Sequence, residues 1–167
     1  MEVTLYICFM KKSLLLILFL TSLSSCQQEN SNGDFKVNPL VENMYDRYVS
    51  AWSEADFETI VEEIYETPFL LFYQDTTIVY NSKNAVKSFL IKTFNQLETN
   101  NYGYSIRNDW EHYKVDDNLV VIEMNFTRFL KDSTIMGAKE RKATYILRES
   151  DGKFKISGMI PHTSVAE

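Results

Sequence analysis

The sequence predicts an α+β domain in which about three helices cover one face of an antiparallel sheet. Three observations lead to this fold class. Two stretches with helical periodicity open the domain, a third follows a short strand pair, and four strand-like stretches separated by turn residues close it. The chain has 167 residues, of which 45% are hydrophobic, so it can bury one ordinary core and we expect one folded domain.

The first helix is expected to begin at Asn38-Pro39, because asparagine caps helices well and proline fits the first helical position. Its apolar side chains recur at helical spacing: Val41, Met44, Tyr45, Tyr48 and Trp52. A second helix is expected to restart through a capping-box-like pair, Ser53 and Asp56. It should stop at Thr67-Pro68, because the residue before proline avoids the α region. Its apolar stripe consists of Phe57, Ile60, Val61 and Ile64.

Two short strands are expected at residues 69–73 and 77–80, joined by a turn at residues 74–76. Ser82 is expected to cap a third helix, which the run Asn-Asn-Tyr-Gly at residues 100–103 would end. Four longer strands then follow, at residues 104–115, 119–130, 140–148 and 153–160.

The stretch 119–130 is the expected central strand, because it is rich in β-branched and aromatic residues and contains neither glycine nor proline. Alternation places four apolar side chains on one face, which we expect to point inward: Val120, Ile122, Met124 and Phe126. Arg128 follows on the same face. A charge there must find either a partner or a polar cavity.

The N-terminal segment has the features of an export signal. Lys11-Lys12 precede an apolar run at residues 14–20, which is too short for a bilayer span of about 20 residues. The sequence Leu23-Ser24-Ser25-Cys26 then resembles the bacterial lipobox, in which the cysteine is acylated and becomes the new N-terminus. An ordinary secretory signal with an incidental cysteine is the alternative.

We therefore expect a lipoprotein signal peptide at residues 1–25, a flexible tether at 26–37 and the folded domain at 38–167. Two or three acyl chains on Cys26 would anchor the protein stably to a membrane. The expected location is the bacterial cell envelope, on the periplasmic side or at the outer membrane. The other cysteine, Cys8, also precedes the domain, so a domain disulfide or thiolate metal site is not expected.

Two stretches carry a resemblance to a known family. The first runs Tyr-Val-Ser-Ala-Trp-Ser-Glu-Ala-Asp-Phe at residues 48–57 and continues through Ile64-Tyr65 to Pro68, and the second is the closing hairpin at 145–156. In their order and spacing, residues 38–162 resemble the nuclear transport factor 2-like superfamily, which includes the SnoaL-like polyketide cyclases and ketosteroid isomerases. This resemblance implies a cone-shaped, curved antiparallel sheet whose concave face is covered by the helices and encloses a pocket.

Strand alternation then indicates which polar side chains share the inward face. Ile106 is in phase with three polar or aromatic residues of its strand, and Phe154 and Ile156 are in phase with residues 158, 160 and 162. A bulge in any strand would reverse these assignments. The candidate pocket residues are Tyr73, Asn108, Trp110, His112, Arg128, Tyr145 and His162.

Histidines, an arginine and a tyrosine in one pocket could perform acid–base chemistry. The alternative, which we favour, is that Trp110 and Tyr145 are core aromatics and that the histidines lie near strand ends in solvent. The isomerase relatives place two carboxylates where this chain aligns Tyr73 and Tyr145, so isomerase chemistry is not expected. No phosphate-binding loop or nucleophile elbow is present in the sequence, and we expect no cofactor and no metal.

Three functions remain open on the sequence. The first, which we favour, is a non-catalytic module that binds a small apolar or carboxylate-bearing ligand, or a partner protein. The second is a lyase, isomerase or hydrolase with His112 or His162 as the base and Arg128 or Tyr145 holding an oxyanion. The third is a homodimerisation module that uses the outer sheet face. Nucleic acid is not an expected partner, because the net charge is −6 and no basic cluster follows Lys11-Lys12.

The lipobox resemblance yields a direct prediction. Replacing Cys26 by serine should move the protein from the membrane fraction to the soluble fraction, because serine cannot carry the acyl chains. Fractionation of cells producing the wild type and the Cys26→Ser variant measures this. A variant that stays membrane-bound as firmly as the wild type would contradict acylation at Cys26.

Overall fold

The computed structural model describes residues 38–162. The predicted signal peptide, the tether and Cys26 lie outside the described residues. Within them, none of the helices combines the length and the apolar character that crossing a membrane requires. The following description is limited to this domain.

The first helix, α2 (Pro39–Ser53), begins as predicted. The Asn38 side chain accepts a hydrogen bond from the backbone N–H of Leu40 at 3.0 Å, and Pro39 occupies the first turn. Its buried residues follow the predicted stripe: Val41, Met44, Tyr45, Tyr48 and Ala51. These side chains point into the domain core, so the helix packs along one face.

The second helical segment differs from the prediction at both ends. Asp56 caps α3 (Phe57–Thr59) by accepting from the Thr59 N–H at 3.0 Å, whereas the Ser53 hydroxyl donates to the Val49 carbonyl within α2. The prediction that Ser53 shares this cap is therefore wrong, because its hydroxyl is already used one turn back. The chain continues directly as the π-helix η1 (Ile60–Ile64).

The predicted stop at Thr67-Pro68 is also wrong, because the helical segment ends three residues earlier, at Ile64. Tyr65 already has extended backbone angles and pairs with Ile156, so the first strand begins there. Pairing with β6 takes Tyr65 out of the helix, and its side chain is buried in the core, where it stacks on Phe69 at 4.5 Å between ring centroids. Thr67-Pro68 consequently lies inside this strand.

Six strands form one sheet in the order β2-β1-β6-β5-β4-β3. Their bounds are β1 (Tyr65–Phe72), β2 (Thr77–Tyr80), β3 (Tyr102–Asp116), β4 (Leu119–Leu130), β5 (Arg141–Ser150) and β6 (Lys153–Pro161). The helix α4 (Lys83–Thr99) follows β2 and is capped by the Ser82 hydroxyl, as predicted. Only β1 and β6 pair in parallel, so the sheet is mixed rather than wholly antiparallel.

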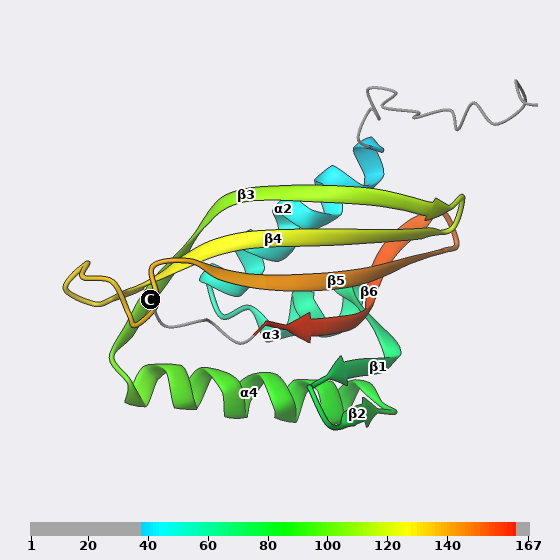
Figure 1. The fold of residues 1–167 in the computed structure, drawn as a ribbon. Coiled ribbons are helices and arrows are strands. Elements are labelled where there is room, and N and C mark those ends of the chain that lie inside the picture. The colour runs from blue at the N-terminus through cyan, green and yellow to red at the C-terminus, as the bar shows by residue number, and fades with distance from the viewer. Residues whose placement is uncertain (1–37, 163–167) are drawn as a thin grey trace, which may run out of the picture. The chain divides into compact units, whose positions relative to one another are not determined.

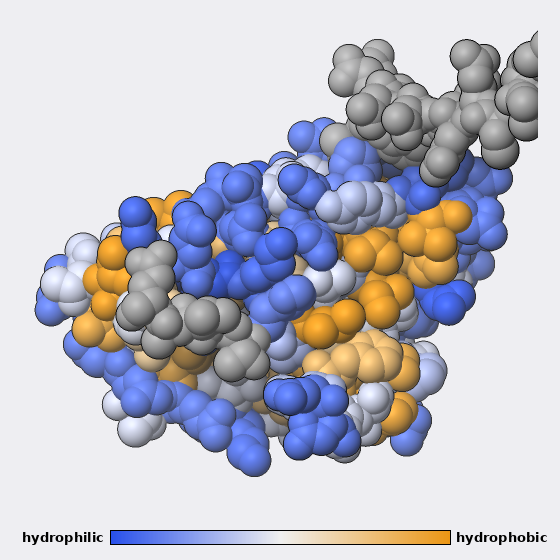
Figure 2. All heavy atoms as spheres, in the orientation of Figure 1, coloured by the Kyte–Doolittle hydropathy of each residue, from blue (hydrophilic) through white to orange (hydrophobic). Residues whose placement is uncertain are grey.

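The helices lie on one side of the curved, open sheet, which confirms the predicted α+β fold class (Figure 1). The inward face of β4 is also as predicted, because Val120, Ile122 and Met124 are all buried in the core cluster that the helices complete. The outer face mixes hydrophilic and hydrophobic side chains (Figure 2). It includes an ion pair of Lys142 with Glu123 at 3.0 Å.

Candidate functional site

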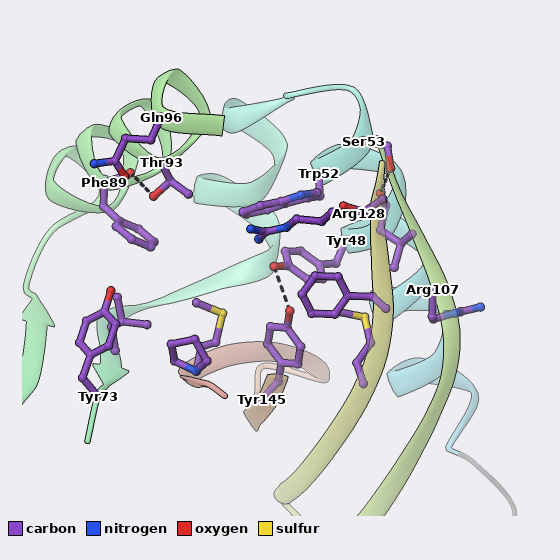
Figure 3. A pocket seen from close by; sticks show the side chains of 17 residues that line it. Tyr48, Trp52, Ser53, Tyr73, Phe89, Thr93, Gln96, Arg107, Arg128 and Tyr145 are labelled. Atoms are coloured by element: carbon purple, nitrogen blue, oxygen red, sulfur yellow. Dashed lines mark hydrogen bonds between the residues drawn. The ribbon is translucent and has the colours of Figure 1, made fainter. Parts of the chain in front are cut away.

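A cavity of about 260 Å³ lies between α2, α4 and the inward face of the sheet (Figure 3). Strands β1, β3, β4, β5 and β6 all contribute to its lining. Aromatic side chains make up much of the wall: Tyr48, Trp52, Phe89, Phe126 and Tyr145. The cavity is therefore suited to an apolar or aromatic molecule, with a few polar groups to orient it.

The most unusual group in the cavity is the guanidinium of Arg128. Its side chain leaves β4 and points into the cavity below Trp52 (Figure 3). Within residues 38–162 its Nε is buried without a hydrogen-bond partner, and its guanidinium carbon lies 5.4 Å from the Phe126 ring centroid. Burial, and secondarily the nearby positive charge of Arg141, lower the pKa of Arg128. Arginine nevertheless keeps its charge in proteins.

The second arginine of the lining, Arg107, is in a different electrostatic situation. It forms an ion pair with Asp46 at 2.9 Å and lies over the Tyr45 ring at 5.4 Å. Its side chain points away from the cavity in Figure 3. Arg128 is thus the cation that faces the cavity without a carboxylate partner among the residues that the structure describes.

Three buried tyrosines form a chain of hydroxyl groups that reaches the cavity. The Tyr65 and Tyr48 hydroxyls lie 3.2 Å apart. The Tyr48 and Tyr145 hydroxyls lie 3.4 Å apart (Figure 3). Burial raises the pKa of Tyr48, Tyr65 and Tyr145 well above that of an exposed tyrosine. All three phenols therefore stay protonated near neutral pH and can donate hydrogen bonds.

The lining offers little for acid–base catalysis. None of the described residues that line the cavity is Asp, Glu, His, Lys or Cys. An ordinary general base is therefore missing, since phenols with raised pKa values bind protons too tightly for this role. Residues 38–162 also contain no group of three or more His, Cys, Asp or Glu side chains that could hold a metal ion.

The structure brings three of the seven predicted pocket residues to the cavity: Tyr73, Arg128 and Tyr145. Trp110 and His112 are half-buried on β3, with ring centroids 5.7 Å apart, and neither lines the cavity. Trp110 instead packs against Tyr45 at 5.0 Å between ring centroids. Whether any of these residues contacts a ligand stays a prediction.

The assignment of Asn108 to the inward face is wrong. The pairing of β3 with β4 shifts by one residue between Arg107 and Asp109, so the alternation reverses at this bulge. Asn108 is exposed and its amide donates to the Thr127 hydroxyl at 3.0 Å. Arg107, which strand alternation had placed outside, contributes to the cavity lining instead, while its guanidinium points away and pairs with Asp46.

The assignment of His162 to the inward face is also wrong, again because the strand pairing shifts. The pairing of β5 with β6 shifts between Ile146 and Leu147, and it is Met159 and Pro161 that line the cavity. His162 is exposed beyond the end of β6, with its Nε2 2.8 Å from the Thr144 hydroxyl. Neither histidine of the chain therefore lines the cavity.

Strand alternation alone also missed the wall that the helices supply. Tyr48 and Trp52 come from α2, and Phe89, Thr93 and Gln96 come from α4. The helical stripe of α2 contains the first two, one turn apart, so a signal for them was present in the sequence. Thr93 and Gln96 are polar residues of α4, whose buried stripe consists of Val86, Leu90 and Leu97, and nothing local marks them as part of a cavity wall.

The family model described as NTF2-like protein (DUF6841) matches residues 36–164, which is most of the chain. The chain belongs to this NTF2-like family. The predicted superfamily is thereby confirmed, and the covered segment coincides with the folded domain described above. No curated protein matches the chain.

Solved NTF2-like structures share the fold of this domain. An NTF2-like protein with a cystatin-like fold from Novosphingobium aromaticivorans aligns with a TM-score of 0.57 at 10% identity, covering 73% of this chain and 78% of that one. An NTF2-like protein from Cytophaga hutchinsonii aligns with a TM-score of 0.54 at 11% identity, covering 75% and 97%. One of unknown function from Shewanella oneidensis aligns with a TM-score of 0.56 at 11% identity, covering 73% and 95%.

The buried phenols predict how the stability of this NTF2-like domain depends on pH. Their pKa values in the folded state lie above the unfolded value of about 10, so unfolding releases protons above that pH. Below pH 10 these phenols should give the free energy of unfolding no pH dependence, because they are protonated in both the folded and the unfolded state. The free energy of unfolding should fall above pH 10 by about 1.4 kcal/mol per pH unit for each phenol.

Denaturant unfolding between pH 8 and 12 measures this dependence. Above pH 10, Tyr145→Phe should make the fall of the free energy of unfolding shallower by about 1.4 kcal/mol per pH unit, which is the contribution of one phenol. Tyr104→Phe, which removes an exposed tyrosine hydroxyl of β3 outside the buried chain, serves as the matched control. An alkaline slope that is equal in all three proteins would contradict the burial of the Tyr145 hydroxyl.

Proposed function

We propose that this NTF2-like domain binds a small organic ligand in the cavity and does not transform it. The observation that carries this proposal is a cavity of about 260 Å³ that is walled by aromatic rings and contains no general base among the described residues. Such a cavity offers contact area and a few orienting polar groups, which is what binding requires.

The enzymatic alternative receives less support from the geometry. It required His112 or His162 as a base close to Arg128 or Tyr145, and neither histidine lines the cavity. Burial also holds the pKa of Tyr145 far above neutral, so its phenol is a hydrogen-bond donor rather than a base. The remaining polar groups of the wall can position a molecule but cannot readily accept a proton from it.

We further propose that the domain performs this binding at a membrane surface of the bacterial cell envelope. The support is the lipobox-like sequence ending at Cys26, together with the short polar stretch between Cys26 and the first helix. A lipid anchor would hold the cavity within a short distance of the membrane while leaving the domain free to exchange its ligand.

Filling the cavity tests the binding proposal. Thr93 lies in the cavity wall on α4, and its hydroxyl bonds to the carbonyl one turn back at 2.9 Å. Thr99 on the same helix makes the equivalent bond at 2.8 Å, but it does not line the cavity. Thr93→Trp should therefore occupy the cavity, while Thr99→Trp is a matched control with the same local bond.

Isothermal titration calorimetry with 2-naphthoate, a flat two-ring probe, provides the readout. We expect wild type and Thr99→Trp to bind the probe alike, and Thr93→Trp to bind it at least about 10-fold more weakly, because lost contacts in a filled site cost more than about 1.4 kcal/mol. Thermal melts confirm that each variant is folded. Equal binding by all three folded proteins would place the probe outside the cavity and overturn the proposal.

A further inference from the structure

We infer that the cavity selects ligands that carry a carboxylate, and that the Arg128 guanidinium and the Tyr145 hydroxyl receive this group together. The inference rests on the proposed binding function and specifies the ligand class. It follows from two independent features of the cavity, one electrostatic and one concerned with hydrogen-bond donors.

The electrostatic feature is positive charge without a protein counter-charge. Arg128 points into the cavity, and no carboxylate among the described residues lines it. Arg141, on the neighbouring strand β5, adds a second guanidinium, which donates to the Met136 carbonyl at 2.8 Å and has no carboxylate partner in residues 38–162. Two half-buried guanidiniums without a carboxylate partner among the described residues create a positive potential, and the buried Nε of each lacks a hydrogen-bond acceptor, which is costly. A ligand anion in the cavity would supply the missing counter-charge to Arg128.

The second feature is a spare proton in the phenol chain. Tyr65, Tyr48 and Tyr145 together carry three hydroxyl protons, and the two hydrogen bonds between them use only two. The third proton belongs to the hydroxyl that does not donate within the chain, which is Tyr65, Tyr145, or Tyr48 when Tyr48 accepts from both neighbours. Two of these three residues, Tyr48 and Tyr145, line the cavity. At the Tyr65 end the third proton would be enclosed in the core, because Tyr65 is 1% exposed and its ring stacks on Phe69 at 4.5 Å.

At the Tyr145 end the same proton reaches the cavity. Tyr145 lines the cavity, and Tyr48 is the hydrogen-bond partner of its hydroxyl among the described residues. A buried donor without an acceptor is unfavourable, so the spare proton is best satisfied on the cavity side of the chain, where a ligand can accept it. In the arrangement that we infer, the hydrogen bonds run from Tyr65 through Tyr48 to Tyr145, and the Tyr145 hydroxyl donates to the ligand. The chain therefore presents a hydrogen-bond donor on the same cavity as Arg128.

These two donors match one chemical group. A carboxylate has two oxygens, so one can accept from the guanidinium and the other from a phenol. The aromatic walls at Trp52, Phe89 and Phe126 then leave room for an apolar body. The cavity of about 260 Å³ limits that body to roughly one or two rings, because pockets for drug-sized ligands start near 300 Å³. The expected ligand is a small aromatic or branched apolar carboxylic acid.

Calorimetry at pH 7 on the purified full-length protein tests this with two probes of nearly equal shape, 2-naphthoate and the neutral 2-naphthamide. Wild type should bind the carboxylate about 10- to 100-fold more tightly, the range expected for hydrogen bonds to a charged group. Arg128→Met should abolish this preference while retaining amide binding, and Tyr145→Phe should reduce it. Arg148→Met, which removes an exposed arginine of β5, should leave the preference intact.

The outcomes separate this inference from the proposal on which it rests. Equal affinity of wild type for the two probes would overturn carboxylate selection while leaving small-ligand binding intact, and this comparison needs no variant. An undiminished preference in folded Arg128→Met would also overturn it. If neither probe binds wild type, the binding function itself fails, and the inference fails with it.

Discussion

The burial of one face of β4 is the constraint on which the rest of the domain depends. Val120, Ile122 and Met124 must all be covered, and α2 with its neighbours supplies the cover. Alternation along the same strand then carries Phe126 and Arg128 onto the same side. A guanidinium is thus brought under the helices by the register that buries the core. The space next to Arg128 forms part of the cavity, and a charge there needs a polar or ionic partner.

Regular pairing explains how much of the domain could be predicted. β4 and β5 pair without interruption from Leu119 with Arg148 to Phe126 with Arg141, and alternation there placed Tyr145 and the apolar face of β4 correctly. The predicted helix starts at Asn38 and Ser82 depend on caps that are readable in the sequence. These features are local, or repeat without a break, so residue order alone determines them.

The wrong and missing predictions of cavity residues have a different physical origin. Asn108 and His162 were placed on the wrong side because the pairings of β3 and β6 shift by one residue, and such bulges depend on how a curved sheet closes over its helices. Thr93 and Gln96 were missed because the wall of a cavity is formed by elements that are distant in sequence. Neither a bulge nor a convergence of this kind leaves a local pattern.

Arg128 and the phenol chain provide charge and hydrogen-bond donors at the cavity, and these support the ligand recognition that we propose. The most direct measurement is a crystal structure of the protein with 2-naphthoate bound. We predict that its rings lie among the aromatic walls and that its carboxylate is within hydrogen-bond distance of both the Arg128 guanidinium and the Tyr145 hydroxyl. A carboxylate turned toward Tyr73 and solvent, or a cavity that stays empty at saturating probe, would contradict the role assigned to this site.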